Sequence, residues 1–198
     1  MWIRPPGPVA DGLRIGLLGG SFNPAHEGHV HASAVALKTL KLDYVWWLVS
    51  PQNPLKSAHG MATFEERLQS ARKLARRPRM VVSGIEAELG TVYTVDTLIK
   101  LKGRFPQIRF VWLMGSDNMI QIARWRDWPA IFALVPVAVV TRPGTVLKAL
   151  SAKAAQRFAN SKRPADARFA NLRPPAWTIL DANRHPASAT ELRARGRP

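Results

Sequence analysis

The sequence predicts a doubly wound α/β fold, in which helices cover both faces of a parallel sheet. Short, almost continuously apolar segments recur along the chain, segments with helical spacing separate them, and glycines and prolines mark the junctions. Strands that are apolar on both faces are typical of parallel sheets buried between helices. We expect one Rossmann-like domain over residues 14–198, preceded by a flexible, Pro- and Gly-rich leader over residues 1–13.

The first half of the chain should contain three strands and two helices. The expected strands are residues 14–19 (RIGLLG), 43–50 (DYVWWLVS) and 80–83, and the expected helices are residues 27–40 and 64–76. Thr63 and Glu66 form a capping-box sequence, so the second helix should begin directly after Thr63.

The second half should continue the alternation of strands and helices. The expected helices are residues 95–103 and 117–123, and the expected strands are residues 108–114, 134–141 and 177–180. Residues 144–172 are basic and Ala-rich, with only a weak helical pattern. A second capping-box sequence, Ser188 to Glu191, predicts another helix start near the end of the chain.

The composition is that of a globular protein with an unusual charge. Hydrophobic residues make up 46% and charged residues 21% of the chain, which argues against disorder throughout. The net charge of +16 suits polyanionic partners, and we expect most of it on a solvated surface. The absence of cysteine excludes disulfides, thiolate zinc sites and cysteine nucleophiles. With no secretory signal and no apolar run of membrane-spanning length, we expect a soluble cytoplasmic protein, either monomeric or homo-oligomeric.

A phosphate-binding loop is predicted at residues 19–29 (GGSFNPAHEGH), between the first strand and the first helix. Gly19 and Gly20 allow a tight turn and a close approach of ligand to backbone. The helix that follows attracts anions through its N-terminal amides and its dipole. His26 and His29 are three residues apart and share one face of the first turn. Two imidazoles and a ring of amides at the end of a strand therefore form a candidate phosphate site.

Other interpretations of this loop are less satisfactory. The two histidines could be zinc ligands, but a third ligand would be needed and no cysteine can supply it. No Gly-Lys-Ser or Gly-Lys-Thr follows the glycines, which excludes a Walker loop, and G-x-G-x-x-G is absent as well. We therefore predict a phosphate site and no metal site made of protein side chains.

The loop resembles the G-[ST]-F-[DN]-P-x-H-x-G-H signature of the nucleotidyltransferase superfamily. Further segments resemble the nicotinate-nucleotide adenylyltransferases of NAD biosynthesis, and the resemblance extends over about residues 14–193. These segments are SPQNPLK (50–56), TVYTVDTL (91–98), GSDNM (115–119) with the later Trp125, VVTRPG (139–144) and SATELR (188–193).

The resemblance implies a role for each matching residue. His26 and His29 would bind the ATP phosphates, and His29 would stabilise charge on the α-phosphate in the transition state. The other ATP-binding residues would be Gly19, Gly20, Ser21, Phe22, Asp117 (at the ribose), and Ser188, Thr190 and Arg193 (at the β- and γ-phosphates). The acceptor would be bound by Ser21 and Lys56 at its phosphate and by Tyr93, Thr94 and Trp125 at its nicotinate ring.

The implied reaction is adenylyl transfer from ATP to nicotinate mononucleotide, which yields deamido-NAD and pyrophosphate. Mg²⁺ is expected with ATP, bound mostly by substrate phosphates and water. The expected partners are ATP and nicotinate mononucleotide, with no nucleic acid and no membrane. The alternative is the same chemistry on nicotinamide mononucleotide or another phosphorylated acceptor, and a remote alternative is a basic RNA-binding protein that reuses the fold.

Overall fold

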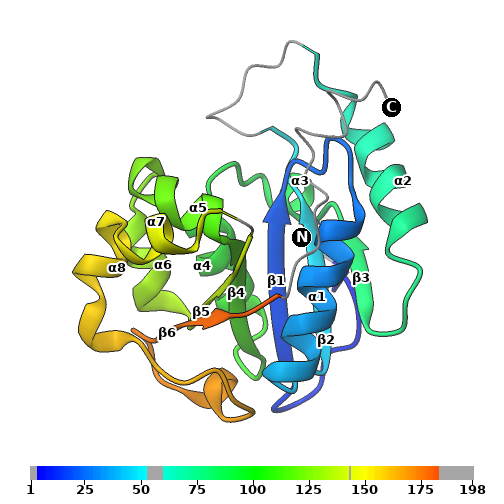
Figure 1. Cartoon of the computed structure of the whole chain (residues 1–198). Coiled ribbons are helices and arrows are strands. Elements are labelled where there is room, and N and C mark those ends of the chain that lie inside the picture. Colours follow the sequence, from blue (N-terminus) through cyan, green and yellow to red (C-terminus); the bar gives the residue numbers. More distant parts are fainter. Residues whose placement is uncertain (1–3, 53–59, 143, 183–198) are drawn as a thin grey trace.

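An all-parallel sheet forms the centre of the molecule (Figure 1). The computed structural model describes residues 4–52, 60–142 and 144–182. Within these residues the sheet has six strands in the order β3-β2-β1-β4-β5-β6. The strands are β1 (Arg14–Gly20), β2 (Tyr44–Val49), β3 (Met80–Ser83), β4 (Arg109–Gly115), β5 (Val137–Val140) and β6 (Trp177–Leu180).

Helices follow the strands along the chain and pack on both faces of the sheet (Figure 1). The α-helices are α1 (Glu27–Thr39), α2 (Phe64–Leu74), α3 (Ile85–Leu89), α4 (Thr94–Arg104), α5 (Ser116–Gln121), α6 (Trp128–Leu134), α7 (Val146–Leu150) and α8 (Lys153–Arg157). Short 3-10 helices lie at Ile122–Arg124, Ala159–Ser161 and Phe169–Asn171. The predicted doubly wound α/β class is confirmed.

Two hydrophobic clusters, one on each face of the sheet, make up the core. Neighbouring residues of a strand belong to opposite clusters: Trp46 lies in one and Trp47 in the other, and Trp112 and Leu113 divide in the same way. α1 and α2 cover the Trp47 side, whereas α3 to α8 cover the Trp46 side. Both faces are therefore buried, and this explains why the strands are continuously apolar rather than alternating.

The strand order places a crevice beside β1. β1 pairs with β2 on one side, with Gly20 opposite Val49, and with β4 on the other side, with Leu18 opposite Leu113. After β1 the chain passes through α1 and adds β2 and then β3 on one side of β1. It later returns and adds β4 on the other side. Such a reversal opens a crevice at the carboxyl ends of the two strands, where doubly wound folds bind their ligands.

Most predicted elements are present, with a few differences in extent. The strand expected over residues 134–141 is wrong at its start, because Leu134 closes α6 and the pairing with β4 begins at Val137. α3 and α6 were not predicted, since five and seven residues are too few to show helical periodicity. The proline of α6 stands in the first turn, where a helix tolerates it. The helix start predicted at Ser188 lies outside the described residues.

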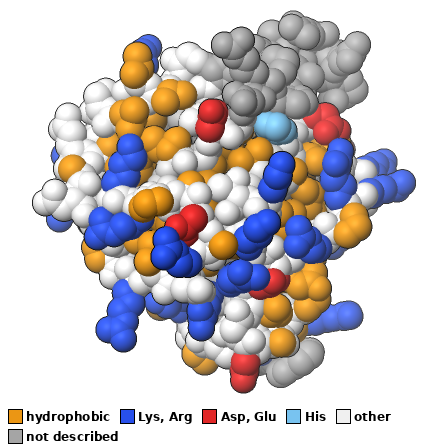
Figure 2. Space-filling view, turned by 60° about the horizontal axis from the view of Figure 1, so that its bottom comes forward, with side chains coloured by type: hydrophobic (Ala, Val, Ile, Leu, Met, Phe, Trp, Pro, Cys, Tyr) orange, Lys and Arg blue, Asp and Glu red, His pale blue; other side chains and the backbone are white. Residues whose placement is uncertain are grey.

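Basic side chains are spread over a broad part of the surface. Figure 2 shows many Lys and Arg side chains on one face, with only a few Asp and Glu among them.

Residues 4–13, which precede β1, form no helix or strand. The amide of Gly12 in this segment donates to the carbonyl of Gln107.

None of the helices in the described part of the chain is long and apolar enough to cross a membrane.

Candidate active site

Two histidines cap the helix that follows β1. The Nδ1 atom of His26 accepts a hydrogen bond from the amide of Gly28 at 3.1 Å, and the Nδ1 atom of His29 accepts one from the amide of His26 at 3.2 Å. The two imidazole centroids are 3.8 Å apart. This is a capping box made of histidines instead of the usual Ser or Thr with Glu, and it satisfies two amides of the first turn of α1.

The capping box also determines where each ring carries its proton. A ring nitrogen that accepts a hydrogen bond has no proton of its own, so neutral His26 and His29 both carry theirs on Nε2. Each ring therefore has an Nε2–H donor on the side away from its cap. Two adjacent donors at a helix N-terminus suit an anion with several oxygen atoms, such as a phosphate group.

An aromatic support lies behind His29. The Phe22 side chain is 2% exposed, lies 4.7 Å from the His29 ring and stacks on Trp47 at 5.1 Å between centroids. Phe22 has a φ of 47°, a conformation that costs a non-glycine residue about 1–2 kcal/mol. Full burial of a phenylalanine side chain gains about 1.5–3 kcal/mol, which offsets that cost. The structure thus places Phe22 in the core beneath His29.

Glycines of this loop have different neighbours. The Trp112 ring occupies the space where a Cβ atom on Gly19 would lie, so a side chain at Gly19 would displace Trp112. Gly20 ends β1, and its carbonyl accepts from the amide of Ser50 at 2.9 Å. The first glycine is therefore required by packing inside the sheet, a reason the sequence did not reveal.

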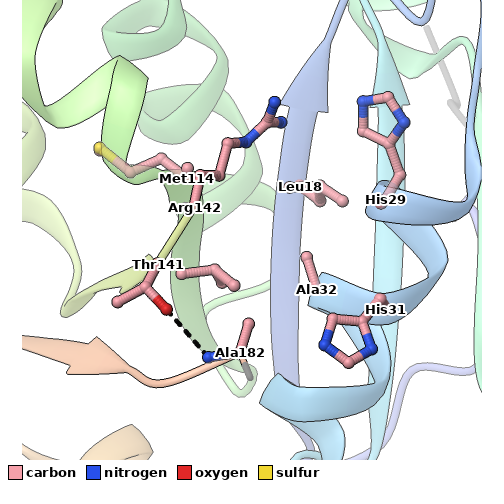
Figure 3. A pocket seen from close by; sticks show the side chains of 11 residues that line it. Leu18, His29, His31, Ala32, Met114, Thr141, Arg142 and Ala182 are labelled. Atoms are coloured by element: carbon pink, nitrogen blue, oxygen red, sulfur yellow. Dashed lines mark hydrogen bonds between the residues drawn. The ribbon is translucent and has the colours of Figure 1, made fainter. Parts of the chain in front are cut away.

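A pocket opens at the predicted crevice, between α1 and the carboxyl ends of β1, β4 and β5. Figure 3 shows His29 and His31 on the α1 side and Met114, Thr141 and Arg142 on the opposite side. The pocket is lined by Leu18, Gly28, His29, His31, Ala32, Met114, Gly115, Val140, Thr141, Arg142 and Ala182. His29 thus belongs both to the helix cap and to the pocket, and the His26 ring lies 3.8 Å from it.

A partly exposed ion pair lies beside the pocket, near the end of β4. The Nε atom of Arg142 lies 3.2 Å from Oδ1 of Asp117, and both side chains are about one third exposed or slightly more. Gly115 gives the pair its room, because a Cβ atom there would collide with Asp117 Oδ1 and lie 2.9 Å from Arg142 Nε. The hydroxyl of Ser116 accepts from the amide of Arg142 at 2.9 Å, which fixes the backbone after β5.

The residues predicted for a nicotinate ring belong to two segments that lie side by side. The guanidinium of Arg126 lies over the Tyr93 ring at 4.8 Å and forms an ion pair with Asp96 at 3.5 Å. Tyr93 is 37% exposed, Thr94 begins α4, and Trp125 is partly buried against the core. The start of α4 and the segment before α6 are thereby joined.

A buried carboxyl group lies beneath the start of α4. Burial raises the pKa of Glu86 to about 7, although a hydrogen bond from Thr97 Oγ1 at 3.0 Å opposes this shift. The amide of Thr91 donates to the carbonyl of Glu86 at 2.9 Å. Glu86 therefore connects α3 to the residues that lead to Tyr93.

Several candidate residues cannot be placed, and others appear that the sequence did not suggest. Lys56, Ser188, Thr190 and Arg193 lie outside the described residues. Arg142 was part of a quoted motif but was given no role. Arg67 was missed altogether, although its position on α2, three residues after Phe64 and four before Ala71, puts it on the buried face of the helix.

Across residues 4–52, 60–142 and 144–182, no three His, Asp or Glu side chains cluster in a way that could hold a metal ion. The donors at this site are imidazole N–H groups, amides and arginine, which favour anionic ligands.

Comparisons with known proteins agree with this geometry. A family model described as cytidylyltransferase-like matches residues 17–195. A protein of Parvibaculum lavamentivorans named probable nicotinate-nucleotide adenylyltransferase is 57% identical over 192 residues, covering 95% of this chain and 94% of that protein. A protein of Methylorubrum extorquens with the same name is 51% identical over 185 residues, covering 92% of this chain and 100% of that protein.

A solved structure shares the fold at low sequence identity. The nicotinic acid mononucleotide adenylyltransferase of Plasmodium falciparum, complexed with NaAD, has a TM-score of 0.69 and 16% identity. The match covers 92% of this chain and 83% of that one.

Proposed function

This chain belongs to the nicotinate-nucleotide adenylyltransferases, within the cytidylyltransferase-like family, and we propose that it transfers the adenylyl group of ATP to nicotinate mononucleotide. The products are deamido-NAD and pyrophosphate. The observation that carries the proposal is the pair of histidines that cap α1 through Nδ1, directly after the carboxyl end of the central strand β1. The proposal includes that the protein acts in the cytoplasm, where ATP-dependent synthesis takes place.

The proposed reaction is a direct in-line displacement. An oxygen of the acceptor phosphate attacks the α-phosphorus of ATP and forms a new P–O bond, while the bond from the α-phosphorus to the bridging oxygen breaks. Pyrophosphate leaves with that electron pair. The attacking phosphate is already an anion, so no general base is required, and catalysis comes from positioning and charge stabilisation.

We assign ATP to the pocket beside α1. His26 and His29 donate from Nε2 to the phosphates, and negative charge that builds up in the transition state strengthens these bonds. Asp117 accepts from the ribose hydroxyls, while the ion pair with Arg142 orients its carboxylate. Ser188, Thr190 and Arg193 are proposed to bind the β- and γ-phosphates.

We assign the acceptor phosphate to Ser21 and Lys56. Among the described residues, the Oγ atom of Ser21 is buried and has no hydrogen-bond partner, which costs about 1–3 kcal/mol. A phosphate oxygen would supply the missing bond. The nicotinate ring is proposed to lie against Tyr93, Thr94 and Trp125.

Mg²⁺ fits this proposal as a companion of ATP. The described side chains offer no ligand cluster of their own, and Mg²⁺ commonly keeps water and substrate phosphates as ligands. When bound, the ion would neutralise charge on the phosphates.

The test is pyrophosphate release with ATP and Mg²⁺, run in parallel with nicotinate mononucleotide and nicotinamide mononucleotide. We expect turnover when ATP and nicotinate mononucleotide are both present, and a clear preference for this acceptor over nicotinamide mononucleotide. Turnover with the amide acceptor alone would keep the mechanism and overturn the acceptor. No release with either compound, together with salt-sensitive binding of RNA, would overturn the proposal in favour of a binding protein.

A further inference from the structure

A buried arginine connects the phosphate-binding loop with the segment that leads to Lys56. Arg67 on α2 is only 2% exposed. Its Nη1 atom donates to the carbonyls of Ser21 at 2.6 Å and Ser50 at 2.7 Å, and its Nη2 atom donates to the carbonyl of Pro51 at 2.8 Å. Its Nε atom donates to the carbonyl of Ala62 at 3.1 Å. Three chain segments thus converge on one guanidinium group.

The charge of Arg67 is compensated in an unusual way. Within the described residues it forms no ion pair with a carboxylate, and its hydrogen-bond acceptors are all backbone carbonyls. The guanidinium also lies over the Phe64 ring, 5.7 Å from its centroid. Desolvation lowers the pKa of its guanidinium, so the fold bears a cost for keeping this cation inside. A hydrophobic residue would fill the same space without that cost. The carbonyl bonds, rather than the packing, therefore distinguish Arg67 from its apolar neighbours on α2.

The carbonyls that Arg67 binds belong to Ser21, which is assigned to the acceptor phosphate, and to the segments around it. One is the carbonyl of Ser21 itself, which precedes the left-handed residue Phe22. Two others, at Ser50 and Pro51, stand where the chain leaves β2 toward Lys56. The amide of Ser50 also donates to the carbonyl of Gly20 at 2.9 Å, so the two segments are joined at two points.

We propose that Arg67 is a positioning residue that sets the spacing between Ser21 and the end of β2 at Ser50 and Pro51, and thereby places Ser21 for the acceptor phosphate. This inference rests on the proposed function for the identity of the acceptor. The planar guanidinium reaches carbonyls on several sides at once, whereas a lysine ammonium is a single point of charge and cannot span them.

The test compares Arg67→Lys and Arg67→Met with Leu68→Ala. Leu68 is the next residue of α2 and is also buried, but it packs in the hydrophobic core, so it serves as a control for general destabilisation. For each variant the KM values for nicotinate mononucleotide and ATP, kcat and Tm are measured. Hydrogen exchange is followed in peptides covering residues 19–26 and 48–52.

We expect Arg67→Met to raise the acceptor KM by about tenfold to a hundredfold, because small displacements of positioning groups have effects of this size. The KM for ATP should change less, Arg67→Lys should fall between wild type and Arg67→Met, and exchange should quicken in both peptides. Leu68→Ala should lower Tm and leave both KM values near those of wild type.

The inference is overturned if both Arg67 variants keep the wild-type acceptor KM and exchange pattern. It is also overturned if Leu68→Ala raises the KM for nicotinate mononucleotide more than the KM for ATP, as expected for the Arg67 variants. If Arg67→Met does not fold, the acceptor KM and the hydrogen exchange of Arg67→Lys still test whether Arg67 has this positioning role. Wild-type protein without turnover would overturn the proposed function alone, because the exchange of the two peptides reports on the role of Arg67 independently of substrate.

Discussion

His26 and His29 cap the same helix through their Nδ1 atoms, and their rings lie 3.8 Å apart. The cap occupies one nitrogen of each ring and leaves Nε2 as the protonated atom in the neutral form. Helix stability and phosphate binding thus depend on opposite sides of the same imidazoles. Substitutions that keep one side and remove the other can separate the two roles.

Replacement of His26 by Asn should preserve the cap and abolish most of the activity. Asn is among the preferred N-cap residues, whereas Ala at an N-cap costs about 1 kcal/mol. We expect His26→Asn to keep a Tm close to wild type, His26→Ala to lower it, and both to lose about a hundredfold or more of kcat. Likewise, His29→Ala should lose most turnover while the fold survives. Thermal denaturation and pyrophosphate release measure the two effects, and full activity in His29→Ala would contradict the catalytic assignment.

Gly115→Ala should weaken ATP binding through the Asp117–Arg142 pair. The added methyl group would collide with Asp117 Oδ1 and crowd Arg142 Nε, so the pair must shift. We expect the KM for ATP to rise about tenfold, as for the loss of one well-placed contact. Gly103→Ala in α4 is the control, because a Cβ atom there meets nothing within 4 Å. It should add about 0.5–1 kcal/mol of stability and leave ATP binding unchanged. Equal KM values for ATP in the two variants would rule out this role.

Glu86→Gln should remove a stability loss that accompanies rising pH. The pKa of Glu86 is about 7 in the folded protein and ordinarily 4.5. Between these values the unfolded chain releases the proton and the folded chain retains it, so the free energy of unfolding falls as the pH rises through this window. Above about pH 7 the ionisation of Glu86 causes no further change in the free energy of unfolding. Gln retains an oxygen that can accept from Thr97 and does not ionise.

Urea unfolding at several pH values between 5 and 8 tests this expectation. The variant should gain stability over wild type as the pH approaches 7. Glu88→Gln is the matched control, because Glu88 lies on the same helix and is exposed. A pH profile of Glu86→Gln identical to that of wild type would show that Glu86 is already ionised in the folded state.

Trp125→Ala should affect the acceptor and not ATP. Stacking of aromatic rings contributes about 0.5–1.5 kcal/mol, so the KM for nicotinate mononucleotide should rise about twofold to tenfold. Trp125→Phe keeps a flat ring and should recover most of the loss. An equal rise in the KM for ATP, or no difference between Ala and Phe, would argue for a purely structural role of Trp125 in the core.

The strands and the phosphate-binding loop could be predicted from the sequence because their signals are local. Residues 14–19 and 43–50 are apolar on both faces, and Thr63 with Glu66 marks the start of α2, as the structure confirms. His26 and His29 could be identified as a pair from their spacing alone. Their capping hydrogen bonds could be identified only from the backbone conformation at the start of α1, because a capping bond depends on φ and ψ as well as on residue type.

Only the tertiary structure decided which distant groups meet. The strand order placed Arg142, at the end of β5, against Asp117 after β4, and it placed Arg67 against carbonyls 16, 17 and 46 residues away. Arg126 and Tyr93 are likewise joined through the packing of α4 near α6. Periodicity reports the face on which a side chain lies, but its partners are set by strand order and helix packing, which bring together residues far apart in the sequence. The sequence thus determined the elements and the phosphate chemistry, whereas the tertiary structure determined how the site is supported.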